Sequence, residues 1–86
     1  MARIILWHKV KDFNAWKTVY DGDIARRNGA GFKEISLTRG KMDPNTLVIE
    51  WESGNPGVME QMVADPELKE AMEQAGVIGM DYYVIQ

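Results

Sequence analysis

Residues 3–10 have the sequence RIILWHKV, and this stretch determines how the rest of the chain is organised. Its β-branched and aromatic residues, at strand length and without a helix break, predict a strand. Because alternate side chains of a strand point to opposite faces, Ile4 and Leu6 are expected on one face of the sheet. Ile5 and Trp7 are then expected on the other face. A strand that is apolar on both faces needs an apolar cover on both faces.

Three further strands and two helical regions follow along the chain. After Asp12, which can cap a helix, apolar residues recur at spacings of three and four and predict a helix that is loosened at Gly22. In chain order, the expected elements are a helix over residues 13–28, strands over residues 32–39 and 46–52, a helical region over residues 55–75 interrupted at Asp65-Pro66, and a strand over residues 81–86.

This order of elements predicts an α+β fold of the ferredoxin-like βαββαβ type, as one domain over residues 1–86. Both helical regions would cover one face of a four-stranded antiparallel sheet with the spatial strand order 4-1-3-2. The second face would be left open, and we expect a second copy of the chain to cover it. The residues expected at this homodimer interface are Ile5, Trp7, Leu47, Ile49 and Trp51.

Composition and charge exclude several classes of function. Ten basic residues against thirteen acidic ones give a net charge of −3, which argues against nucleic acid as a partner. With no cysteine and one histidine, the chain lacks the ligand set of a metal centre, and we expect no bound metal, haem or flavin. Residues 4–7 are apolar, which is too short a run for a signal peptide or a membrane span. We therefore expect a cytoplasmic protein without membrane contact.

Three segments of the chain together resemble a known superfamily: HKVKDFNAWKTVYD at residues 8–21, VIEWES at 48–53 and MVADPELKEAMEQAGVIG at 62–79. They are similar to the dimeric α/β-barrel proteins, the superfamily of the antibiotic-biosynthesis monooxygenases. The resemblance implies two sheets packed face to face, helices outside, and a pocket in each subunit between helices and sheet. The same scaffold carries cofactor-free oxygenases, polyketide cyclases and haem-degrading enzymes, so the chemistry must be argued from the site.

His8 and Tyr20 are the candidate catalytic residues. His8 is the only side chain whose ordinary pKa lies near neutrality, and its position places it on the same face as Ile4 and Leu6. If residues 46–52 form a parallel neighbouring strand, Glu50 lies on that face and can orient the imidazole. The alternative is a buried histidine with a structural role. The Tyr20 hydroxyl is a possible donor to a substrate.

Further residues are candidates for lining a ligand pocket. Arg39 can pair with an anionic or phenolate group, and methionines suit an apolar ligand of irregular shape. Each candidate has an ordinary alternative, namely core packing for the apolar residues and a solvated charge for the others. The proposed pocket residues are Trp16, Arg39, Glu50, Met59 and Met62.

Two classes of function follow from the resemblance. The first is a small-molecule-binding homodimer that acts as a cofactor-independent monooxygenase on an aromatic polyketide-like substrate. The alternative is a non-catalytic ligand-binding or stress-associated dimer of the same fold, or a polyketide cyclase. Haem chemistry is not expected, because the haem-degrading relatives carry their iron ligand on a helix and His8 lies in a predicted strand.

Overall fold

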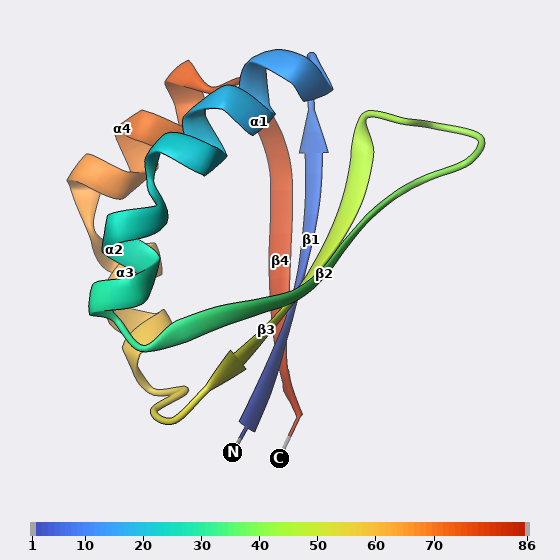
Figure 1. Cartoon of the computed structure of the whole chain (residues 1–86). Coiled ribbons are helices and arrows are strands. Elements are labelled where there is room, and N and C mark those ends of the chain that lie inside the picture. Colours follow the sequence, from blue (N-terminus) through green and yellow to red (C-terminus); the bar gives the residue numbers. More distant parts are fainter. Residues whose placement is uncertain (1, 86) are drawn as a thin grey trace.

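The computed structural model describes residues 2–85, in which helices cover one face of a twisted sheet (Figure 1). In chain order the elements are β1 (Ala2–Val10), α1 (Phe13–Gly22), α2 (Ile24–Gly29), β2 (Phe32–Arg39), β3 (Thr46–Ser53), α3 (Val58–Ala64), α4 (Pro66–Gln74) and β4 (Val77–Ile85). The strands are antiparallel in the order β2-β3-β1-β4, which confirms the predicted order 4-1-3-2. The predicted ferredoxin-like α+β sandwich is therefore confirmed.

The predicted helix over residues 13–28 is divided into α1 and α2 at Asp23. Asp12 caps α1 as expected, because its carboxylate accepts a hydrogen bond from the Asn14 N–H at 3.3 Å. At the other end, the Asp23 N–H donates to the carbonyl oxygen of Tyr20 at 3.2 Å, which closes α1. The short helix α2 therefore forms a separate element rather than a continuation of α1.

The second helical region is divided at Asp65-Pro66, as predicted. The Asp65 carboxylate accepts a hydrogen bond from the Glu67 N–H at 2.9 Å, and Pro66 occupies the first turn of α4, where no N–H is needed. The preceding helix α3 begins at Val58, later than residue 55. Within residues 2–85, no helix is long and apolar enough to cross a membrane.

The last strand is longer than predicted, because β4 begins at Val77 rather than at residue 81. Gly76 has φ +86°, a left-handed conformation that residues other than glycine rarely adopt, and it ends α4. The next residue, Val77, already pairs with Val10 of β1. Gln86, which the sequence assigns to this strand, lies outside the described residues.

The register of β1 and β3 corrects the predicted dimer interface. Leu6 pairs with Ile49 and Trp7 with Val48, so the odd-numbered residues of β3 share the helix-covered face with the even-numbered residues of β1. Leu47, Ile49 and Trp51 are accordingly core residues, with exposed fractions of 0%, 0% and 5%. Their assignment to an open face is wrong, since the more apolar side of β3 packs under the helices.

Ile5 and Trp7 do lie on the face opposite the helices. They share it with Val48 of β3 and with Tyr83 and Ile85 of β4, which are paired in register with the odd-numbered residues of β1. These three side chains are exposed, and together the five form what we call the open apolar face. Among residues 2–85, no helix covers this side of the sheet (Figure 1).

Candidate functional site

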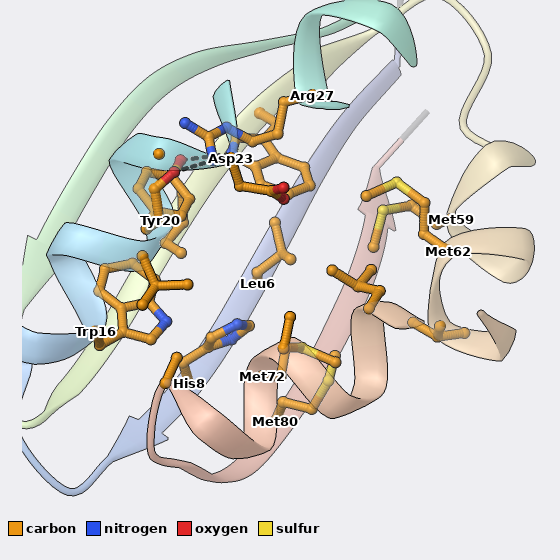
Figure 2. A pocket seen from close by; sticks show the side chains of 18 residues that line it. Leu6, His8, Trp16, Tyr20, Asp23, Arg27, Met59, Met62, Met72 and Met80 are labelled. Carbon is orange, nitrogen blue, oxygen red and sulfur yellow. Dashed lines mark hydrogen bonds between the residues drawn. The ribbon is translucent and has the colours of Figure 1, made fainter. Parts of the chain in front are cut away.

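A cavity of about 360 Å³ lies between the covered face of the sheet and the helices (Figure 2). Its size is within the range of sites that hold small organic ligands. Figure 2 shows Trp16 and Tyr20 along one side, Met59 and Met62 on the opposite side, and Leu6 between them. The lining residues are Leu6, His8, Trp16, Val19, Tyr20, Gly22, Asp23, Arg27, Ile49, Trp51, Met59, Met62, Val63, Leu68, Ala71, Met72, Ala75 and Met80.

His8 is part of the cavity wall, with an exposed fraction of 6%. Its Nδ1 lies 3.0 Å from the carbonyl oxygen of Trp7. Because a carbonyl oxygen only accepts hydrogen bonds, this contact places the proton on Nδ1 and leaves the lone pair on Nε2. Burial lowers the pKa of His8, against the smaller effect of the Trp7 hydrogen bond. At neutral pH His8 is therefore an uncharged imidazole that can accept a proton.

Tyr20 contributes its ring to the cavity, while its hydroxyl is already engaged. The hydroxyl donates to Oε1 of Glu34 at 2.7 Å and accepts from Nε1 of Trp51 at 3.0 Å. Burial is the largest effect on this group and raises the pKa of Tyr20 to about 12. At neutral pH the phenol is protonated and its proton is committed to Glu34. In this arrangement Tyr20 is an aromatic wall rather than a base.

The aromatic wall is a row of stacked groups that begins at His8. The His8 ring meets Trp16 edge to face with ring centroids 5.9 Å apart, and Trp16 stacks on Tyr20 at 4.7 Å. Beyond Tyr20, the guanidinium carbon of Arg27 lies 3.7 Å from the centre of the Tyr20 ring. The row therefore joins a neutral imidazole to a cation along one side of the cavity.

Methionines form much of the opposite side. The sequence placed Met59 and Met62 at the pocket, and both line the cavity. Met72 and Met80 line it as well, although the sequence interpretation did not include them. Met72 lies four residues after Leu68 in the helical pattern, and this spacing was an available signal. The flexible thioethers give the cavity an adaptable apolar surface.

Glu50 and Arg39 do not line the cavity. Strands β1 and β3 are antiparallel, with Glu50 opposite Ile5, so its side chain lies on the open face, where it forms an ion pair with Arg3 at 3.3 Å. The hypothesis that Glu50 orients His8 through a parallel neighbour is therefore wrong. The Arg39 guanidinium stacks on Phe13 at 3.7 Å and donates to the Pro44 carbonyl at 2.9 Å.

Arg27 is one of two charged cavity residues, with Asp23, that the sequence interpretation missed. Its exposed fraction is 7% and it lines the cavity. Its Nη1 donates to the backbone carbonyl of Tyr20 at 2.6 Å. The seven-residue spacing from Tyr20 is about two helical turns, which was the available signal. Within residues 2–85, no three His, Cys, Asp or Glu side chains are grouped as metal ligands.

No protein-family model and no curated protein sequence matches this chain. Solved structures do match it. SnoaB, a cofactor-independent oxygenase from Streptomyces nogalater, has a TM-score of 0.69 at 15% identity, covering 99% of this chain and 90% of that one. An antibiotic biosynthesis monooxygenase has a TM-score of 0.65 at 14% identity, covering 100% and 97%. An uncharacterized NIPSNAP domain protein from Burkholderia xenovorans has 0.66 at 9% identity, covering 100% and 93%.

These matches confirm, at the level of the fold, the resemblance to antibiotic-biosynthesis-monooxygenase-like proteins that the sequence segments indicated. At such low identity the likeness shows the fold alone. An oxygenase and a NIPSNAP domain protein share this fold, so the fold alone does not define a reaction. The chemistry of the chain must be argued from the residues of its own cavity.

Proposed function

We propose that the protein is a homodimeric, small-molecule-binding monooxygenase that works without a cofactor on an aromatic polyketide-like substrate. The observation that carries the proposal is His8, an uncharged imidazole with Nε2 available, in the wall of an otherwise mostly apolar cavity. A base of this kind suits the removal of a proton from carbon or oxygen next to an aromatic carbonyl.

The proposed reaction converts a ring CH₂ group to a carbonyl. His8 Nε2 accepts one proton, and the resulting carbanion, delocalised over the phenolic rings, transfers electrons to molecular oxygen. One oxygen atom bonds to the carbon, and the other leaves as water with both hydrogens of the CH₂ group. The substrate thus supplies all the electrons. The apolar walls keep bulk water away from the carbanion, which protects it from reprotonation before it reacts with oxygen.

The open apolar face supports the proposed homodimer. Trp7 and Tyr83 lie on this face with Ile5, Val48 and Ile85, and large apolar side chains on an uncovered sheet favour association. A second copy packed sheet to sheet would remove them from water. The partner would then lie on the far side of the sheet from the cavity, so each chain would keep its own His8.

Oxygen uptake tests the catalytic proposal. With dithranol, a dihydroxyanthrone, as the probe, the wild-type protein is expected to consume oxygen and form the quinone. His8→Ala is expected to lower the rate by about a hundredfold or more, the usual contribution of a general base. Lys9→Ala is the matched control, because Lys9 is the next residue of β1 and is exposed on the opposite face. An equal rate in His8→Ala would contradict the proposal.

The same experiment separates the alternatives. A polyketide cyclase would use His8 for proton removal without consuming oxygen. A non-catalytic binding protein would bind the probe with no chemical change, and its affinity would not depend on the basicity of Nε2. Binding without oxygen uptake would therefore replace the monooxygenase by one of these two functions.

A further inference from the structure

Arg27 is a buried cation without a carboxylate partner among residues 2–85. Among residues 2–85 there are five ion pairs, and Arg27 is in none of them. The adjacent Arg26 differs, because it contacts Asp23 at 3.1 Å and Asp65 at 3.3 Å. Burying a guanidinium without an opposite charge is unfavourable, and proteins normally pair such a group. The absence of a pair calls for another source of negative charge.

The contacts that Arg27 does make leave part of its guanidinium free. Nη1 donates to the Tyr20 carbonyl and the plane stacks on the Tyr20 ring, and neither partner carries a full negative charge. Within residues 2–85, Nε and Nη2 donate no hydrogen bond, yet no fully buried side-chain nitrogen there lacks a partner. These two nitrogens therefore keep accessible surface. Arg27 lines both the main cavity and a smaller adjoining one of about 260 Å³.

Three carboxylates line the two cavities that Arg27 lines, and each is engaged elsewhere. Asp21, in the smaller cavity, forms an ion pair with Lys17. Asp23 lines the cavity, but its Oδ1 accepts from Nε of Arg26. Glu34, which lines the smaller cavity, accepts the Tyr20 hydroxyl proton at 2.7 Å. None of the three forms an ion pair with Arg27. The negative charge that would match Arg27 must therefore come from outside the described chain.

We infer that Arg27 binds an anionic oxygen of the ligand, a carboxylate, enolate or phenolate, whose rings lie along Trp16 and Tyr20. Trp16 and Tyr20 give the cavity an aromatic wall, which favours contact with an aromatic ring of a ligand. The two unengaged nitrogens of Arg27, Nε and Nη2, can donate parallel N–H bonds to the two oxygens of a carboxylate, or both to a single enolate or phenolate oxygen. The inference rests on the cavity of the proposed function and adds to it that the substrate is an anion.

Two fluorescent probes of similar ring structure test this inference. Anilinonaphthalene sulfonate is an aromatic anion, and N-phenylnaphthylamine is its neutral counterpart. The wild-type protein is expected to bind the anion about tenfold more tightly, as one charge-assisted hydrogen-bonded contact would give. Ala71→Trp, which fills the cavity from α4, is expected to abolish the binding of both probes and so place them in the cavity. Equal affinity of the wild type for both probes would overturn the inference.

Arg27→Met is expected to lower the affinity for the anionic probe about tenfold and to change the affinity for the neutral probe by less than about twofold. The matched control is Arg39→Met, because that guanidinium also stacks on an aromatic ring at 3.7 Å and donates to one backbone carbonyl, but outside the cavity. It is expected to leave both affinities unchanged. Arg27→Lys keeps the positive charge and serves as the test if the Met variant does not fold. It is expected to retain the preference for the anionic probe. Equal weakening of both probes in Arg27→Met would mean that Arg27 only supports the wall.

This experiment is independent of turnover. If the anion preference depends on Arg27 while dithranol is not oxidised, the anion site stands and the monooxygenase fails. If dithranol is oxidised through His8 while both probes bind with equal affinity, the monooxygenase proposal stands and the anion site fails.

Discussion

The two faces of the sheet differ in what covers them and in what they carry. The covered face packs against α1 to α4 and lines the cavity with His8. The opposite side of the sheet is the open apolar face, and the Arg3–Glu50 ion pair lies on the same side. Strand β1 is apolar on both sides, so it contributes to both. We therefore propose that the two faces have separate roles, with ligand chemistry on the covered face and association on the other.

The largest expected effect separates neighbouring residues of β3 that lie on opposite faces. Ile49→Ala removes fully buried atoms from the core and is expected to lower the free energy of unfolding by about 2–5 kcal/mol, independently of protein concentration. Val48→Ala is expected to cost less than about 1 kcal/mol in dilute solution, because Val48 is exposed in the single chain. Urea unfolding of the wild type and both variants measures the two losses of unfolding free energy. Equal costs in dilute solution would contradict the assignment of the faces.

The proposed dimer is tested on the open apolar face alone. Tyr83 is 55% exposed in one chain, so Tyr83→Asp is expected to leave the fold intact. Its burial against a partner would make the change cost about 2 kcal/mol of association free energy, which is roughly a thirtyfold weaker dimer. Sedimentation measures the dimer population. Lys41→Glu, outside the strands, is the control, and a wild-type protein that is monomeric at micromolar concentration would remove the dimer from the proposal.

The pH dependence of stability reports on the covered face. The folded-state pKa of His8 is lowered by burial, so below the ordinary value of 6.5 the unfolded chain binds a proton that the folded chain does not. The stability that His8 contributes is thus present above pH 6.5 and falls as the pH falls toward its folded-state pKa, by at most about 1.4 kcal/mol per pH unit. Comparing the acid unfolding of the wild type and His8→Gln isolates this contribution. Identical acid profiles would show that His8 titrates normally.

The smallest expected effect concerns the Tyr20 hydroxyl. Tyr20→Phe keeps the ring in the aromatic wall but removes the group between Glu34 and Trp51, and it is expected to lower the free energy of unfolding by about 1 kcal/mol. If dithranol is a substrate, its rate of oxidation is expected to change by less than about twofold, because this hydroxyl is not the base. Thermal denaturation and oxygen uptake measure the two effects. A large loss of rate with an unchanged stability would restore Tyr20 as a catalytic residue.

The fold was accessible from the sequence because local patterns agree with it. The bounds of β2 match the prediction, and the Asp65-Pro66 break was predicted from capping chemistry. The face of β3 was assigned wrongly because β1 is apolar on both sides and cannot fix the orientation of its neighbour. The polarity of β3 itself, with Glu50 and Glu52 on one face, was the better guide.

The site was only partly accessible. His8 and the methionines at positions 59 and 62 are in the cavity as predicted, since their own strand and helix patterns point inward. Arg27 was missed because its burial depends on the division of the helix at Asp23 and on packing against Tyr20, which are tertiary effects. Arg39 was a candidate because its charge can pair with an anionic or phenolate group, but its guanidinium stacks on Phe13 and does not line the cavity.

Nuclear magnetic resonance of the imidazole is the most direct test of the claim that His8 is an uncharged base facing the cavity. His8 is the only histidine in the chain, so its ring signals need no assignment. A titration is expected to give a pKa below 6.5, with the proton on Nδ1 and Nε2 unprotonated at neutral pH. A pKa at or above 6.5, or a neutral form with its proton on Nε2, would contradict the role assigned to His8.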